Sequence, residues 1–156
     1  LIDNHDYALY SFVELFNCDK EIRDIVHIDA HRDDAIFTYE VGKITLENVS
    51  DYLSKKRVSD YLDCAKKAGI IGEIFSYTQS FEFEKFIVPS SPYILNLDID
   101  IFGPEGEYVE DIVKTRVIEN AWDGADAVIF ATSPGFIEKE KVISKIKYFI
   151  EKKHDK

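Results

Sequence analysis

The stretch DIVHIDAHRDD at residues 24–34 begins with mostly apolar side chains and ends in charged ones. Successive side chains of a strand point to opposite faces, so His27 and Asp29 share one face of the strand that this run predicts. The charged residues follow at the carboxyl end of that strand, which is where open α/β sheets bind ligands. We therefore expect a buried strand of a parallel sheet, with a functional site directly after it.

A second stretch, YILNLDIDIF at residues 93–102, alternates apolar and polar residues even more regularly. The alternation predicts a strand that carries Asn96, Asp98 and Asp100 on one face. Buried carboxylates this close repel one another unless a cation lies between them. Carboxylates mixed with imidazole suit Mn²⁺ or Fe²⁺, and Zn²⁺ accepts them as well. The metal ligands expected from the two stretches are Asp29, His31, Asp33, Asp98 and Asp100.

The rest of the chain alternates between β-rich runs and amphipathic stretches with helical spacing, which is typical of an α/β protein. We expect a three-layer α/β/α sandwich with a largely parallel sheet, formed by a single domain over residues 1–156. Gly69 is expected to end the central helix. Helices are expected at residues 7–17, 46–68, 107–122 and 138–153, and further strands at residues 73–80, 81–88 and 124–132.

The composition limits the classes of partner. A net charge of −11 argues against nucleic acid and anionic membranes, because their phosphate groups would be repelled. No run approaches the roughly 20 apolar residues that span a bilayer, and the first residues do not resemble a signal peptide. Cys18 and Cys64 are too far apart in sequence to suggest a CxxC metal site, and they indicate no disulfide framework. We therefore expect a cytoplasmic protein, with a cationic substrate left open and the oligomeric state undetermined.

The two motifs resemble those of the ureohydrolase superfamily, which includes arginases, agmatinases and histone-deacetylase-like enzymes. Residues 29–33 (DAHRD) resemble its Asp-Ala-His-x-Asp motif, and residues 98–100 (DID) resemble its Asp-x-Asp motif. His5 stands where the histidine that completes the ligand set would be expected. The resemblance implies an abbreviated arginase-like fold that binds two divalent metal ions, Mn²⁺ first and Fe²⁺ or Zn²⁺ as alternatives. One ion would be bound by His5, Asp29, Asp33 and Asp98, and the other by Asp29, His31, Asp98 and Asp100.

The resemblance also implies a reaction, the hydrolysis of a guanidino C–N bond that converts arginine to ornithine and urea. Two ions about 3.5 Å apart would activate water. Asp100 would orient the nucleophile, and His27 would act as a proton shuttle or support a ligand, with a buried core histidine as the alternative.

The chain departs from arginases at residues 128–135 (VIFATSPG), where no carboxylate replaces the substrate-binding glutamate. The combination of His5, the two aspartate motifs and the stretch SPGF at residues 133–136 is most similar to a short branch of the superfamily that includes peptide arginases. The expected substrate is therefore a small guanidino compound or an arginine-containing peptide. Residues 132–136 would line an open cleft for it, with an ordinary strand-ending turn as the alternative.

Two other functions are compatible with the same residues. An amidohydrolase of the deacetylase kind would use one metal ion and a tyrosine donor, so the number of ions per chain separates it from an arginase-like enzyme. A binding module would use metal for stability without turnover. Replacing Asp29 or Asp98 by asparagine separates that module from an enzyme, because a catalytic site loses activity while much of the fold remains.

Overall fold

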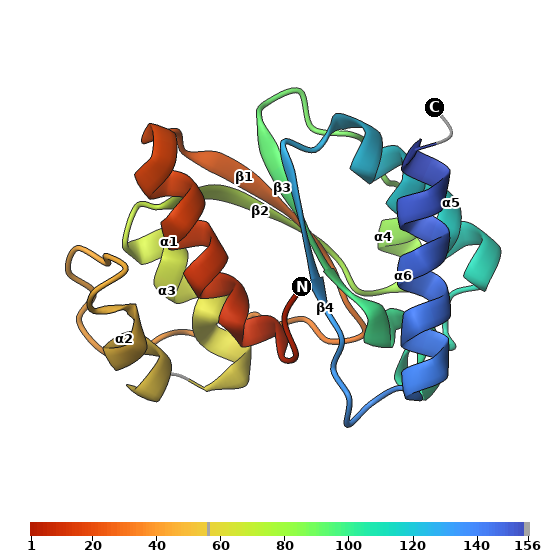
Figure 1. The fold of residues 1–156 in the computed structure, drawn as a ribbon, viewed down its shortest axis with the longest axis horizontal. Coiled ribbons are helices and arrows are strands. Elements are labelled where there is room, and N and C mark those ends of the chain that lie inside the picture. The colour runs from red at the N-terminus through yellow and green to blue at the C-terminus, as the bar shows by residue number, and fades with distance from the viewer. Residues whose placement is uncertain (56, 155–156) are drawn as a thin grey trace.

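Four parallel strands form the centre of the protein, which we describe from a computed structural model over residues 1–55 and 57–154. The strands are β1 (Arg23–Ile28), β2 (Ile71–Tyr77), β3 (Tyr93–Asp98) and β4 (Ala127–Ala131). Their order across the sheet is β2-β1-β3-β4, and each neighbouring pair is parallel (Figure 1). The expected parallel sheet is confirmed, and its two central strands are those that carry the site motifs.

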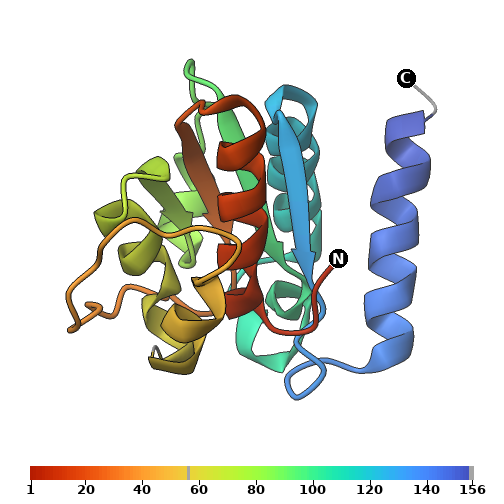
Figure 2. The ribbon, with the colours of Figure 1, turned by 60° about the vertical axis from the view of Figure 1, so that its left-hand side comes forward.

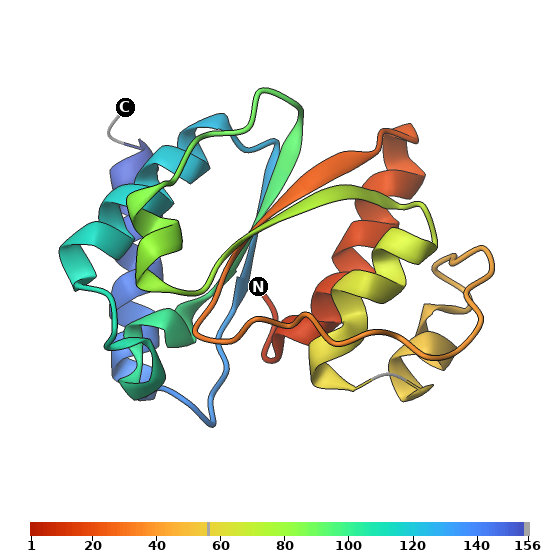
Figure 3. The ribbon, with the colours of Figure 1, turned by 180° about the vertical axis from the view of Figure 1, so that it is seen from behind.

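Helices cover both faces of the sheet, which gives the expected three layers (Figure 1, Figure 3). One face is covered by α1 (Ala8–Asp19), α2 (Val49–Lys55) and α3 (Tyr61–Lys67). The other is covered by α4 (Ser80–Glu84), α5 (Asp111–Gly124) and α6 (Lys139–His154). Among the helices of the described residues, none is both long enough and apolar enough to cross a membrane.

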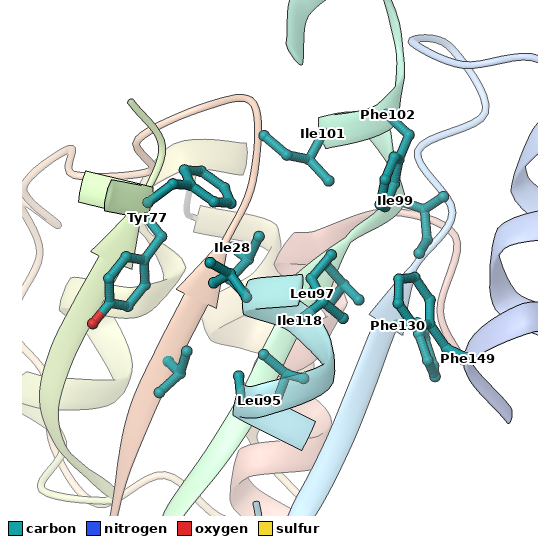
Figure 4. Close-up of a cluster of buried hydrophobic side chains, with 14 of the residues drawn as sticks. Ile28, Tyr77, Leu95, Leu97, Ile99, Ile101, Phe102, Ile118, Phe130 and Phe149 are labelled. Atoms are coloured by element: carbon teal, nitrogen blue, oxygen red, sulfur yellow. The ribbon is translucent and has the colours of Figure 1, made fainter. Parts of the chain in front are cut away.

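The alternation along β3 divides its side chains between the two layers. Leu95 and Leu97 enter the core under α4, α5 and α6, whereas Ile94 enters the core on the α1–α3 side (Figure 4). Asn96 and Asp98 alternate with the two leucines, so they face the same side as Ile94. The polar residues of the site therefore belong to the α1–α3 side of the sheet.

Replacing Leu97 by alanine is expected to lower the free energy of unfolding by about 3 kcal/mol, because Leu97 is fully buried and its removal leaves a cavity. Urea denaturation followed by circular dichroism measures this loss. Leu46→Ala is the matched control, since Leu46 is 50% exposed and its loss is expected to change stability by less than about 0.5 kcal/mol. Equal losses for the two variants would contradict the placement of Leu97 in the core.

Residues 81–88 do not form the expected strand. Residues 81–84 lie in α4, in which Phe83 is buried in the core and Phe81 is 49% exposed. The physical reason is topological. Because β2 and β3 are parallel and separated by β1, the chain must cross the face of the sheet between them, and α4 lies on that crossover.

The helix expected over residues 46–68 is also wrong as a single element. α2 is followed by a short 3-10 helix, η2 (Val58–Asp60), and then by α3, while residue 56 lies outside the described residues. Arg57 is extended, with φ −88° and ψ 164°, which interrupts helical geometry. Gly69 follows α3 with φ +68°, a left-handed conformation that favours glycine, so the expected stop at this residue is confirmed.

The N-terminal segment lies against the edge of β4 (Figure 2). The Ile2 N–H donates to the Phe130 carbonyl at 2.8 Å, and the Thr132 N–H donates to the Ile2 carbonyl at 3.0 Å. The 3-10 helix η1 (His5–Tyr7) follows directly. This pairing brings the N-terminal segment to the end of the sheet at which the two site motifs lie.

Candidate metal centre

The two sequence motifs meet at the carboxyl ends of β1 and β3. Ile28 and Leu97 pair across these strands, so Asp29 and Asp98, which follow them, lie side by side. One expectation is corrected: β3 ends at Asp98, and Asp100 lies in a 3-10 helix, η3 (Ile99–Phe102), instead of on the strand. The Asp98 side chain accepts a hydrogen bond from the Asp100 N–H at 3.0 Å, which turns the chain at this point.

His5 reaches the same carboxylates from η1. Its Nδ1 is 2.7 Å from Asp98 Oδ2 and 2.9 Å from Asp29 Oδ2. Its Nε2 is 3.2 Å from Asp33 Oδ2. The Tyr61 ring stacks on the imidazole, with 5.6 Å between the ring centroids. The four ligands expected for one ion therefore converge.

His31 and Asp100 lie on the more exposed side of the cluster. His31 Nδ1 is 3.2 Å from Asp29 Oδ1 and 3.1 Å from Asp100 Oδ2. The other ring nitrogen, Nε2, is 2.6 Å from Glu105 Oε2. A carboxylate on the outer nitrogen of a histidine fixes the ring and directs the other nitrogen inward, as is common around protein-bound metals.

The potential ligand atoms form three overlapping groups among the described residues, and every group contains Asp29. The atoms of each group lie within 4.8 Å of one another. The groups are His5 with Asp29 and Asp98, His27 with Asp29 and Asp33, and His31 with Asp29 and Asp100. Asp29 is thus shared by all three groups, whereas Asp98 is grouped with His5 alone among the histidines.

The donor atoms fit a divalent cation. Asp33 Oδ2 and Asp100 Oδ2 are buried, and neither accepts a hydrogen bond of good geometry from the described residues. Buried carboxylate oxygens without such partners are costly, and a cation that they coordinate removes this cost. Imidazole nitrogen and carboxylate oxygen together suit Mn²⁺, Fe²⁺ or Zn²⁺.

Protonation in the metal-free cluster follows from its crowding. Burial, followed by the charge of Asp29, raises the pKa of Asp33 to about 7 and that of Asp100 to about 8. Burial lowers the pKa of His5, but its contacts with Asp29 and Asp98 outweigh this effect and raise the pKa to about 11. The contact with Asp29 raises the pKa of His31 to about 9. Near pH 7, protons on His5, His31 and Asp100 therefore offset part of the negative charge of the cluster.

Two residues of the cluster adopt left-handed backbone conformations. Asp33 has φ 48° and Ser133 has φ 39°. Such conformations cost about 1 kcal/mol or more for residues other than glycine, and they concentrate at functional sites. Ser133 Oγ donates a hydrogen bond to Asp98 Oδ2 at 2.5 Å. Asp33 and Ser133 thus keep an unfavourable backbone conformation at positions where their side chains contact the cluster.

Glu105 and Ser133 extend the site beyond the ligands expected from the sequence. Glu105 lies in a 3-10 helix, η4 (Pro104–Gly106), and a side chain at Gly106 would collide with the Ile101 carbonyl. No motif spacing relates Glu105 to His31, so only the folded turn brings them together. Ser133 belongs to the stretch expected to line a cleft, but it is buried against Asp98 instead.

A hollow of about 460 Å³ lies close to His31. It is lined by Pro104 and by residues 134–139, and the Phe136 ring lies 5.0 Å from the His31 ring. Of the residues expected to line a cleft, Pro134, Gly135 and Phe136 therefore do so.

Comparisons of this chain with protein families, with curated proteins and with solved structures found no match. The function proposed below therefore rests on the side chains of this centre.

Replacing Glu105 by glutamine is expected to weaken metal binding by about 10-fold, because the His31 ring loses a charged acceptor on Nε2. Isothermal titration with Mn²⁺ measures the change. Glu107→Gln is the matched control, since Glu107 is an exposed carboxylate on the same loop. Identical affinities for the two variants would show that Glu105 does not orient His31.

Proposed function

We propose that this protein is an arginase-like metallohydrolase that uses two divalent cations to hydrolyse the guanidino group of arginine. The observation that carries the proposal is the sharing of Asp29 by overlapping groups of ligand atoms at the ends of two adjacent parallel strands. The order of the ligands along the chain supports the same assignment, because His5, residues 29–33 and residues 98–100 follow the ureohydrolase pattern.

When bound, the cations supply Lewis acidity and make water nucleophilic near neutral pH. Water adds to the guanidinium carbon, the bond from this carbon to arginine Nε breaks, and the nitrogen takes up a proton, which yields ornithine and urea. Asp100 Oδ2 is the oxygen best placed to accept a proton from the nucleophile, since it is without a hydrogen bond among the described residues and faces His31. Glu105 holds the His31 ring in position.

The substrate that we propose is an arginine side chain within a peptide. The hollow formed by Pro104 and residues 134–139 lies beside the exposed edge of the cluster, where Phe136 contacts His31. A net charge of −11 favours a cationic substrate. An arginine side chain is long enough to cross such a rim while the peptide backbone stays outside.

Incubation of Mn²⁺-loaded protein with a library of arginine-containing peptides tests this function. The expected result is the release of urea together with conversion of arginine to ornithine, detected by mass spectrometry. Peptides with lysine or citrulline in place of arginine are the controls and should remain unchanged. If no peptide and no free guanidino compound released urea from fully loaded protein, the proposed reaction would be wrong.

A deacetylase-like amidohydrolase is the second candidate, and Tyr108 is the residue that favours it. Its hydroxyl is 3.5 Å from the Asp29 carbonyl, and burial together with the charges of Asp29 and Asp100 raises its pKa to about 12. It therefore remains a hydrogen-bond donor at neutral pH. Tyr108→Phe is expected to reduce kcat by about 100-fold if this hydroxyl stabilises the transition state, with KM nearly unchanged. Release of acetate from acetyl-lysine peptides, without urea from arginine peptides, would favour this candidate.

A further inference from the structure

His27 lies on the buried side of the metal centre. Its side chain is fully buried, and its Nε2 has no hydrogen-bond partner among the described residues. A buried ring nitrogen without a partner is costly, and here it faces carboxylates. The position is remote from solvent, so it is poorly suited to passing a proton to a departing product.

The distances around His27 Nε2 are those of ligands around a shared ion. Nε2 is 3.6 Å from Asp29 Oδ2 and 3.9 Å from Asp33 Oδ2. These separations are too long for hydrogen bonds. Two ligand atoms that each lie about 2.1 Å from one metal ion are roughly 3 to 4 Å apart, depending on the bond angle. The spacing therefore leaves room for a cation among these three atoms.

Asn96 determines which nitrogen of His27 faces the carboxylates. The side-chain amide of Asn96 lies 3.2 Å from His27 Nδ1 and 2.7 Å from the Tyr61 hydroxyl. Nδ1 is thereby occupied on the side away from the cluster. Asn96 Nδ2 is the atom that faces Nδ1, and Asn96 Oδ1 has no hydrogen-bond partner among the described residues. Metal binding by Nε2 requires the ring proton on Nδ1, so the Asn96 amide would turn by 180° and accept that proton through Oδ1.

We propose that His27 Nε2 is a direct metal ligand and that, with Asp29 and Asp33, it binds a cation on the buried side of the centre, which we call the inner site. This assignment rests on the metal centre of the proposed function but not on its guanidino substrate. His5 and His27 belong to separate groups of ligand atoms, so His27 supplies the imidazole nitrogen of the group that contains Asp33. The additional nitrogen shifts the preference of the inner site toward Fe²⁺ and Zn²⁺ relative to Mn²⁺.

Nitrogen NMR of the protein labelled with ¹⁵N at its four histidines tests the assignment. On titration with Zn²⁺, the ring nitrogens of His5, His27 and His31 are expected to move to metal-bound chemical shifts. His154, exposed in the last turn of α6, is the internal control and should not move. A residue that only positions the carboxylates would not show a metal-bound shift, so the readout separates ligation from support.

Substitutions assign the signals. His27→Gln is expected to remove one metal-bound signal and to weaken Zn²⁺ binding by about 100-fold, whereas His154→Gln leaves the affinity unchanged. If His27→Gln does not fold, His31→Gln combined with His154→Gln leaves two rings, both expected to be metal-bound.

Two failures are distinguishable. Metal-bound shifts for His5 and His31 without one for His27 would overturn this assignment alone. No metal-bound shift for any ring, and no heat of binding with Zn²⁺ or Mn²⁺, would overturn the proposed metal centre as well.

Discussion

Asp29→Asn is expected to abolish binding of both cations and, with it, hydrolytic activity. Asp29 belongs to every group of ligand atoms in the centre, so its loss affects both sites at once. The decrease in Mn²⁺ affinity should be at least about 100-fold, since residues that merely support a ligand already contribute that much. The substitution keeps the size of the side chain, so the far-ultraviolet circular dichroism spectrum should not change.

Asp34→Asn is the matched control for this prediction. Asp34 lies in the same loop, but its side chain is 73% exposed and pairs with Arg32 at 3.2 Å. Isothermal titration with Mn²⁺ and elemental analysis after gel filtration should give wild-type values for Asp34→Asn and no bound metal for Asp29→Asn. Two bound ions per chain in Asp29→Asn would contradict the bridging role.

Raising the pH is expected to destabilise the metal-free protein. The pKa of His5 is raised from 6.5 to about 11 and that of His31 to about 9, so their stabilising contribution is present below pH 6.5 and is lost as the pH rises through these values. The pKa values of Asp33 and Asp100 are raised from 3.8 to about 7 and about 8. The free energy of unfolding therefore also falls as the pH rises from 3.8 through these values. Asp29 has a lowered pKa and opposes this trend only at acidic pH.

Cation binding should show the reverse dependence on pH. Cations bound in this centre would replace protons on His5, His31, Asp33 and Asp100, so binding would release protons and become tighter as the pH rises. Thermal unfolding with a chelator should give a Tm at least about 3 °C lower at pH 8.5 than at pH 6, while excess Mn²⁺ should raise Tm more at the higher pH. A chelated protein that becomes more stable between these pH values would contradict the assignment of protons to the cluster.

The sequence predicted the central strands and the carboxylates at their ends because both depend on local pattern. Alternation along residues 24–28 and 93–98 matches β1 and β3, and the carboxylates follow at their ends. A strand was also expected at residues 81–88, where the crossover between parallel strands contains α4. Local pattern carries no information about the position of a strand in the sheet.

Contacts between distant segments were beyond the reach of the sequence. Glu105 approaches His31 across 74 positions of the chain, and Ser133 approaches Asp98 across 35. The role of His27 depends on distances to two carboxylates and on Asn96, 69 positions away. Each of these relations is created by packing, so a motif can place side chains at the end of a strand but cannot identify the distant residues that contact them.

The attachment of the N-terminal segment has a kinetic consequence. Backbone hydrogen bonds join Ile2 and Asp3 to β4 and to the residues directly after it, and His5 joins the same segment to Asp98 on a central strand. A cation bound by His5 and Asp98 would therefore cross-link the N-terminal segment, at the edge of the sheet, to the central strand β3. Fraying of this segment would release the metal before the strands separate, so the lifetime of the loaded centre would be set by local opening and not by global unfolding.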